Sequence, residues 1–296
     1  MRIAYAIALA GTVLAATPAL AADPDWAKVD QALGKQGADQ PGGIRKYGLP
    51  RTDLHVTLDG VAIKSSLALG GWLAFKPMGQ QTMVMGDLVL TEEEVNPVMT
   101  KLLADGITIT AVHNHLLRAQ PATFYMHVAG QGDPVKLASA LHDGLAEGSK
   151  TPFGAPATAA PPAAPMELDT AELGQILGYK GTVNGGVVQF SIPRHDSVED
   201  DGMAVPPAMG TAIAINFQPT DGGKAAITGD FVLTAAEVNP VLRAFRENGI
   251  EVTALHNHML DDQPRLFFVH FWANDDAAKL ARGLRAALDK VNIARS

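Results

Sequence analysis

Residues 110–117 read TAVHNHLL, and residues 253–260 read TALHNHML. One further histidine follows each copy at the same distance, so a His-x-His pair with a third histidine occurs twice, about 143 residues apart. Six of the nine histidines of the chain belong to these two sets. The first histidine set is His113, His115 and His127, and the second histidine set is His256, His258 and His270. Three side chains able to bind metal, repeated in register, indicate a functional site in each copy.

The duplication extends over most of each half of the chain. Pro50-Arg51 recurs as Pro193-Arg194 at the same spacing, and the Gly-Gly pair before each of them recurs as well. We therefore expect a first repeat domain at residues 27–147 and a second repeat domain at residues 167–292. Residues 148–166 are rich in alanine and proline and cannot bury an apolar face, so they are predicted to be a linker.

The beginning of the chain is typical of a secretory signal peptide. Arg2 precedes an apolar run, and Ala19-Leu20-Ala21 resembles a signal-peptidase site. We expect residues 1–21 to be removed by cleavage between Ala21 and Ala22, and the mature protein to be periplasmic or secreted. The apolar run is too short for a membrane span, and the chain has no cysteine for a lipid anchor or a disulfide. A net charge of −8 argues against nucleic-acid partners.

The pattern of apolar residues predicts the same succession of elements in both repeats. In the first repeat we expect a hairpin of two strands, a helix that ends at Gly106, two further strands and a final helix. The predicted ranges are strands at 67–75, 82–90, 107–117 and 122–129 and a last helix at 134–145. The fold class is therefore α+β, with two tandem homologous domains, each a mostly antiparallel sheet packed with helices. The duplication favours a pseudo-symmetric contact between the repeats.

Alternation along the predicted strand places His113 and His115 on one face. The same face carries Ile107 and Ile109, so the histidines are expected to continue an apolar stripe that faces the core. The next strand begins within a few residues and is expected to pair antiparallel, which would bring His127 close to them.

Three neutral imidazoles suit a divalent transition metal, and they leave a fourth tetrahedral position open for water or a substrate. Zinc is the favoured ion, and a metal-dependent hydrolase or lyase is the corresponding activity. Copper is an alternative because methionines lie near both sets in the sequence. Those methionines are Met83, Met85, Met126 and Met259. A second hypothesis is a non-catalytic envelope protein that binds an unidentified small-molecule or envelope ligand, with the histidines forming its ligand pocket or the interface between the domains.

Four carboxylates recur with the histidines. Glu94 and Glu237 each stand three residues after a threonine, which predicts a helix-capping role and leaves acid–base catalysis as a weaker alternative. Each is also followed by Asn-Pro, which offers a second start for the same helix. Asp87 and Asp230 follow a glycine late in a strand, where a turn is the simpler interpretation and a role beside the histidines is the alternative.

Three segments resemble the LppY/LpqO-like family of bacterial envelope proteins, known as a duplicated domain of unknown function. They are GDLVLTEEEVNPV (86–98), ITITAVHNHLL (107–117) and QPATFYMHV (120–128), each with a partner in the second half. The resemblance implies export and duplication, and it marks the two histidine sets as the residues that characterise the family. Named members are actinobacterial lipoproteins, but this chain has no cysteine at its cleavage site, so the resemblance does not imply an anchor here.

Overall fold

The computed structural model describes residues 24–153 and 166–294. The predicted signal peptide and the central part of the predicted linker therefore lie outside the described residues. No helix in the described part of the chain is long and apolar enough to cross a membrane.

Each repeat forms a six-stranded antiparallel sheet, as predicted, and the strand order is the same in both repeats. The first sheet has the order β1-β2-β5-β6-β8-β7, and the second has the corresponding order β9-β10-β13-β14-β17-β15. The strands of the first sheet are β1 (Ala38–Gln40), β2 (Ile44–Pro50), β5 (Gly70–Met78), β6 (Gln81–Thr91), β7 (Thr108–His113) and β8 (Thr123–Gly132). Those of the second are β9 (Thr182–Asn184), β10 (Val187–Pro193), β13 (Ala212–Pro219), β14 (Lys224–Thr234), β15 (Glu251–His256) and β17 (Leu266–Asp276).

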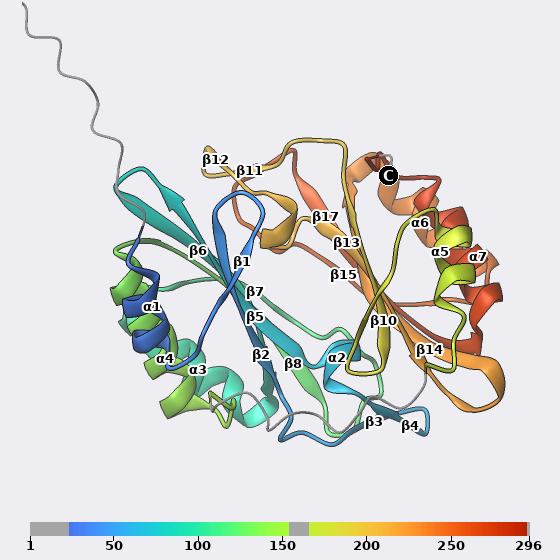
Figure 1. Cartoon of the computed structure of the whole chain (residues 1–296), viewed down its shortest axis with the longest axis horizontal. Coiled ribbons are helices and arrows are strands. Elements are labelled where there is room, and N and C mark those ends of the chain that lie inside the picture. The colour runs from blue at the N-terminus through green and yellow to red at the C-terminus, as the bar shows by residue number, and fades with distance from the viewer. Residues whose placement is uncertain (1–23, 154–165, 295–296) are drawn as a thin grey trace, which may run out of the picture.

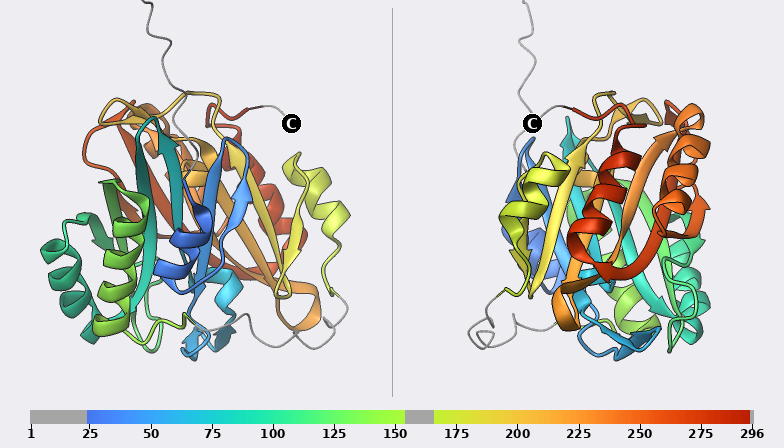
Figure 2. Two further views of the ribbon diagram at one scale, coloured as in Figure 1. Left: turned by 60° about the vertical axis from the view of Figure 1, so that its left-hand side comes forward. Right: turned by 90° about the vertical axis from the view of Figure 1, so that its right-hand side faces the viewer.

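The helices cover the outer face of each sheet, and the two sheets face one another, so the molecule has four layers (Figures 1 and 2). The helices of the first repeat are α1 (Trp26–Leu33), α3 (Glu92–Ala104) and α4 (Pro134–Gly148). Those of the second repeat are α5 (Thr170–Leu177), α6 (Ala235–Glu247) and α7 (Ala277–Leu288). Apolar side chains fill the space between each sheet and its own helices, while Met83 and Met85 of the first sheet pack with residues of the second.

The starts of the helices follow from capping residues in the sequence. Thr91 and Glu94 form a complete capping box at the start of α3, and Thr234 and Glu237 do the same for α6. Of the two predicted starts, the threonine is therefore the correct one, and the Asn-Pro pair lies inside the first turns of the helix. Asp133 caps α4 through the backbone amides of Val135 and Lys136, with Pro134 at the first helical position.

Each repeat has an excursion between its second and third sheet strands that packs against the other repeat. The first consists of β3 (Val56–Leu58), β4 (Val61–Ile63) and α2 (Ser65–Ala68). The second consists of β11 (Glu199–Asp200), β12 (Met203–Ala204) and the short helix η1 (Pro207–Met209); η2 (Asp221–Gly223) and β16 (Asp262–Gln263) complete the second repeat. Gln218 of β13 bonds to the first excursion on both sides, accepting from the Lys64 amide at 2.9 Å and donating to the Ala62 carbonyl at 2.8 Å.

All four predicted strands occur with shifted boundaries, and two of the shifts change the local structure. The strand expected at 67–75 begins only at Gly70, because residues 65–68 form the short helix α2, whose Leu67 is buried among the excursion side chains. The strand expected at 107–117 ends at His113, so His115 lies beyond the strand. The predicted antiparallel pairing of this strand with the next one is confirmed, with His113 opposite Tyr125.

Gly229 in β14 lets two neighbouring strands approach closely. A Cβ atom there would lie 2.0 Å from the Ala214 carbonyl oxygen, so the backbone would have to move. We expect Gly229→Ala to lower the free energy of unfolding by about 1–3 kcal/mol through overpacking, measured by urea denaturation. Gly48→Ala is the matched control, because a Cβ on that strand residue would have no heavy atom within 4 Å. Equal stability of the two variants would contradict the prediction.

Candidate functional site

A β-bulge in β7 decides which way the first histidine set points. Ile109 lies opposite Val128 of β8, but Ala111 lies opposite His127, and the register shifts between the two pairs. The extra residue is Thr110. Since Val128 and His127 are successive residues of β8, they project from opposite faces of the sheet, and so do Ile109 and Ala111.

The prediction that the histidines continue the apolar stripe is therefore wrong. Ile107 and Ile109 pack into the core beneath the helices of their repeat, whereas His113, beyond the bulge, stacks on His256 of the other sheet. The second repeat has the same bulge, between Val252 and Ala254.

The two histidine sets, predicted as one cluster in each repeat, lie together in the structure. They form a single six-histidine cluster, which consists of His113, His115, His127, His256, His258 and His270. Each ring of one repeat stacks on a ring of the other. The ring centroids of His113 and His256 are 3.5 Å apart, those of His115 and His270 are 3.6 Å apart, and those of His127 and His258 are 3.6 Å apart.

An aromatic side chain closes each end of the cluster. Tyr125 stacks on His115 with 3.3 Å between the ring centroids, and Phe268 stacks on His258 with 3.5 Å. These two aromatic residues occupy equivalent positions of β8 and β17, two residues before the last histidine of each set. The Tyr125 hydroxyl donates to the Ala68 carbonyl at 2.6 Å, so it is engaged outside the cluster.

Seven ring nitrogens of the six-histidine cluster are buried without a hydrogen-bond partner among the described residues. They are Nε2 of all six histidines and Nδ1 of His113. The protonation state is clearest at His270, whose Nδ1 lies 2.8 Å from the Gly229 carbonyl oxygen. A carbonyl can only accept, so Nδ1 carries the proton and Nε2 presents its lone pair to the cluster.

Burial keeps these imidazoles neutral. Removal from water lowers the pKa of His113 to about 3, with a further contribution from neighbouring His256, and it lowers the pKa of His256 to about 4. The pKa values of the four other rings also lie well below the ordinary value of 6.5, first through burial and then, for all four, through neighbouring histidines. Neutral imidazole is the form that binds metal ions.

The donor atoms are spaced closely enough for metal coordination. Donor atoms of His113, His115 and His127 all lie within 4.8 Å of one another. The same limit holds for a second group, formed by the second histidine set together with His113. Bonds of about 2.1 Å at tetrahedral angles place two nitrogens about 3.4 Å apart, so either group would need only a small contraction to bind an ion.

Asp87 and Asp230 face the cluster and do not form turns. Asp87 lies opposite His127 in the sheet, and Asp230 lies opposite His270. One carboxylate oxygen of Asp87 is 3.7 Å from Nε2 of His127, and one of Asp230 is 3.8 Å from Nε2 of His258. Burial raises the pKa of both carboxyls well above the ordinary value; Lys46 acts against this at Asp87, and the charge of Asp87 adds to it at Asp230.

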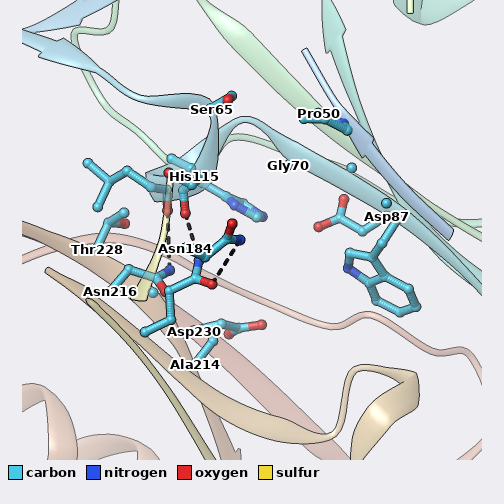
Figure 3. A pocket seen from close by; sticks show the side chains of 18 of the residues that line it. Pro50, Ser65, Gly70, Asp87, His115, Asn184, Ala214, Asn216, Thr228 and Asp230 are labelled. Carbon is cyan, nitrogen blue, oxygen red and sulfur yellow. Dashed lines mark hydrogen bonds between the residues drawn. The ribbon is translucent and has the colours of Figure 1, made fainter. Parts of the chain in front are cut away.

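A pocket of about 990 Å³ between the two sheets opens onto this site (Figure 3). Asp87, Asp230 and His115 point into it from different sides, and His127, His258 and His270 also line it. The remaining lining includes Lys46 and Trp72 of the first sheet and polar residues of β9 and β10. Four histidines of the cluster thus lie at the wall of the pocket.

Comparison with protein-family models gives a match over two segments of the chain, residues 27–147 and 171–290. The matching description is Domain of Unknown Function (DUF1259). The chain belongs to this family. Each matched segment contains one histidine set and one six-stranded sheet, so one DUF1259 repeat contributes one half of the cluster.

Other known proteins add little to this assignment. No curated protein matches the chain. Among solved structures, a trimeric bacterial microcompartment shell protein, PduB, matches with 12% identity, a TM-score of 0.21 and coverage of 88% of this chain and 96% of its own. EtuB from Clostridium kluyveri matches with 8% identity, a TM-score of 0.21 and coverage of 86% and 88%. TM-scores this low carry no argument about the fold or the function of the DUF1259 repeats.

Glu94 and Glu237 each form an ion pair with a buried arginine of their own DUF1259 repeat. Arg51, which is 1% exposed, donates to both carboxylate oxygens of Glu94 at 2.7 and 3.1 Å. Arg194 binds Glu237 in the same way at 2.7 and 3.2 Å. Neither glutamate lines the pocket, so the structure does not bring the two weak catalytic candidates to the histidines.

Lys46 and Trp72 are site residues that the sequence did not suggest. The Lys46 ammonium lies 4.3 Å from the centre of the Trp72 ring and donates to the Ala208 carbonyl at 2.9 Å. Burial lowers the pKa of Lys46 to about 8, although nearby Asp87 acts to raise it. Aligning the DUF1259 repeats places Gln189 at the position of Lys46 and Ala214 at that of Trp72, and this departure from the repeat was the available signal.

The capping glutamates give a prediction that depends on pH. Burial acts to raise the pKa of Glu94, but bonds from Arg51 and from backbone amides outweigh it, so the pKa lies below its ordinary 4.5. A lowered pKa in the folded state stabilises the protein above pH 4.5, and this contribution is lost as the pH falls through the lowered pKa. We expect Glu94→Gln to cost roughly 3 kcal/mol at pH 7 in urea denaturation, and less as the pH falls below 4.5.

Glu93→Gln is the control for this substitution, because Glu93 is exposed in the same helical turn. It should leave stability nearly unchanged. A Glu94→Gln variant as stable as Glu93→Gln at pH 7 would contradict the structural role of Glu94.

Proposed function

We propose that this protein binds divalent transition metal at the six-histidine cluster and presents the ion to a ligand in the adjoining pocket. The observation that carries the proposal is the set of seven buried imidazole nitrogens without partners. A buried polar atom without a partner lowers the free energy of unfolding by about 1–3 kcal/mol. A bound cation would recover part of this loss by accepting the imidazole lone pairs. Neutral imidazoles with spare lone pairs are suitable ligands for zinc.

The pocket supports a chemical role for the ion beyond a structural one. Metal held by three or four histidines beside a cavity can polarise a bound oxygen or lower the pKa of bound water, which is the chemistry of metal-dependent hydrolases and lyases. The polar lining and Lys46 suit a small, polar ligand. A non-catalytic binding protein would use the same pocket, and turnover of a ligand that binds there would decide between the two.

Copper is the second candidate ion, and the placement of two methionines favours it. Met85 and Met259 line a small pocket together with His127 and His258, so thioether and imidazole groups border the same space. Met126 is instead buried beneath the helices of its repeat, and Met83 packs in the core shared with the second repeat. Of the four methionines named from the sequence, Met85 and Met259 therefore support the copper alternative, and Met83 and Met126 do not.

Export to the periplasm or the exterior is part of the proposal. It is supported by the signal-peptide pattern of residues 1–21 and by the resemblance of the histidine strands to the LppY/LpqO-like envelope proteins. We expect the mature protein to begin at Ala22, and mass spectrometry of the protein recovered from the periplasm or the medium measures this. A full-length cytoplasmic product would contradict export.

Metal analysis of protein purified without a histidine tag tests the metal site. We expect at least one equivalent of bound metal after equilibration with Zn²⁺, and a melting temperature that rises with the Zn²⁺ concentration. The double variants His113→Ala/His115→Ala and His256→Ala/His258→Ala should each lose at least about 100-fold in affinity. The first variant removes ligands from the first repeat, and the second variant removes ligands from the second repeat. Both variants should fold without metal, because each substitution also removes buried nitrogens that have no partner.

The control is His55→Ala/His195→Ala, which removes two exposed histidines outside the cluster. It should bind metal as the wild type does. Less than about 0.2 equivalents of metal in the wild type, with no stabilisation by Zn²⁺ or Cu⁺, would overturn the proposal. If copper is the physiological ion, Met85→Leu/Met259→Leu should weaken Cu⁺ binding and leave Zn²⁺ binding unchanged.

A further inference from the structure

We propose that the six-histidine cluster is a dinuclear centre, in which two neighbouring divalent ions are held by both repeats and Asp87 and Asp230 supply the negative charge. This inference rests on the metal binding proposed above, and it adds the number of ions, their proximity and two ligands. The occupants are divalent transition metals that accept nitrogen and oxygen donors, such as Zn²⁺ and Cu²⁺.

The cluster offers more ligand nitrogens than one tetrahedral ion can bind. A neutral imidazole has one nitrogen with a free lone pair, so the six rings offer six ligands, and an ion that binds four would leave two of them without a partner. The cluster also contains two groups with ligand spacing, one made by the first histidine set and one made by the second set with His113. His113 belongs to both groups, and a neutral ring binds only one ion, so one ion would take the first histidine set and the other ion would take the second histidine set.

Stacking between the repeats places the two ions close together. In each of the three stacked pairs, the ring centroid of a histidine from one set lies 3.5–3.6 Å from that of a histidine from the other set. The donor atoms of both groups lie within 4.8 Å of a donor atom of His113, so ions bound in the two groups would be neighbours, as in two-metal centres, whose ions lie on the order of 3.5–4 Å apart.

Two dications in a buried interface need negative charge, and neutral imidazoles supply none. Asp87 and Asp230 are the carboxylates among the described residues that line the pocket. Oδ1 of each is buried without a hydrogen-bond partner. Oδ1 of Asp87 lies 3.7 Å from Nε2 of His127, and Oδ2 of Asp230 lies 3.8 Å from Nε2 of His258. These distances are too long for hydrogen bonds, but they suit two donors about 2.1 Å from one ion.

Asp87 and Asp230 each lie beside a buried histidine of the cluster. His127 is 5% exposed and His258 is 7% exposed, and the Nε2 of each has no hydrogen-bond partner and lies within 4 Å of a carboxylate oxygen. Two dications and two carboxylates leave net positive charge at the end of the pocket, and Lys46 adds to it. The ligand that fits this charge is an oxyanion, such as a carboxylate or phosphate group, which can bridge two ions.

Copper titration of the full, metal-stripped chain tests the inference. We expect two equivalents of Cu²⁺ to bind at pH 7. As the second equivalent binds, the electron paramagnetic resonance spectrum of isolated ions should give way to a broadened spectrum with a half-field transition, because the ions are neighbours. Asp87→Asn/Asp230→Asn should weaken the second equivalent by at least about 10-fold. The same variant should raise the melting temperature of the metal-free protein, since it removes buried charge.

Asp143→Asn is the control, because Asp143 is exposed on α4 and its substitution changes the charge away from the centre. It should bind two equivalents with the wild-type spectrum. One equivalent in the wild type, or two with additive spectra of isolated ions, would overturn the dinuclear centre while leaving metal binding intact. An aspartate variant that binds both equivalents as the wild type does would overturn the role of the carboxylates. No bound metal at all would overturn the proposed function itself.

Discussion

One extra residue in an edge strand of each sheet controls what the interior of this molecule contains. Without the bulges, strand alternation would place the histidines of β7 and β15 on the side of each sheet that packs against the helices. The two histidine sets would then lie in two separate apolar cores. With the bulges, the strands begin on one face and end on the other. The bulge residue Thr253 also bonds across the interface, since its hydroxyl donates to the His115 carbonyl at 2.6 Å. The same local irregularity thus orients one histidine set and holds part of the other.

The arrangement concentrates polar groups where folding normally excludes them. Each repeat has a conventional apolar core between its sheet and helices, and those cores carry the stability of the fold. The interface between the sheets can therefore tolerate imidazoles and carboxylates that contribute little to folding on their own. Each stacked pair of rings joins the two repeats, so a single repeat contains only half of the cluster.

The sequence predicts the parts of this structure that are local. The repeat, the fold class, the pairing of β7 with β8 and the capping boxes at Thr91 and Thr234 all follow from short-range patterns. The bulge at Thr110 does not, because an extra residue leaves no mark in a string of alternating letters. Asp87 resembled a turn residue because it follows a glycine. In the structure Gly86 instead allows close packing of two neighbouring strands, since a Cβ there would lie 2.8 Å from the Trp72 carbonyl oxygen.

The sequence predicted the two histidine sets but not that they form one cluster, because contacts between the repeats depend on how the two sheets pack together. The differences between the repeats then give the pocket its character. If both sheets were identical on their inner faces, Trp72 and Lys46 would be met by their own counterparts, and the space would be filled. The second repeat instead places Ala214 and Gln189 there, and Gln189 is used in a bond to the Ser66 carbonyl at 2.8 Å. The histidines match between the repeats, whereas the residues around them differ, and only the first repeat lines the cavity with lysines (Lys46 and Lys64) and with an indole (Trp72). The histidines are therefore shared by both repeats, while Lys46 and Trp72 of the pocket lining stand at positions that the two repeats no longer share.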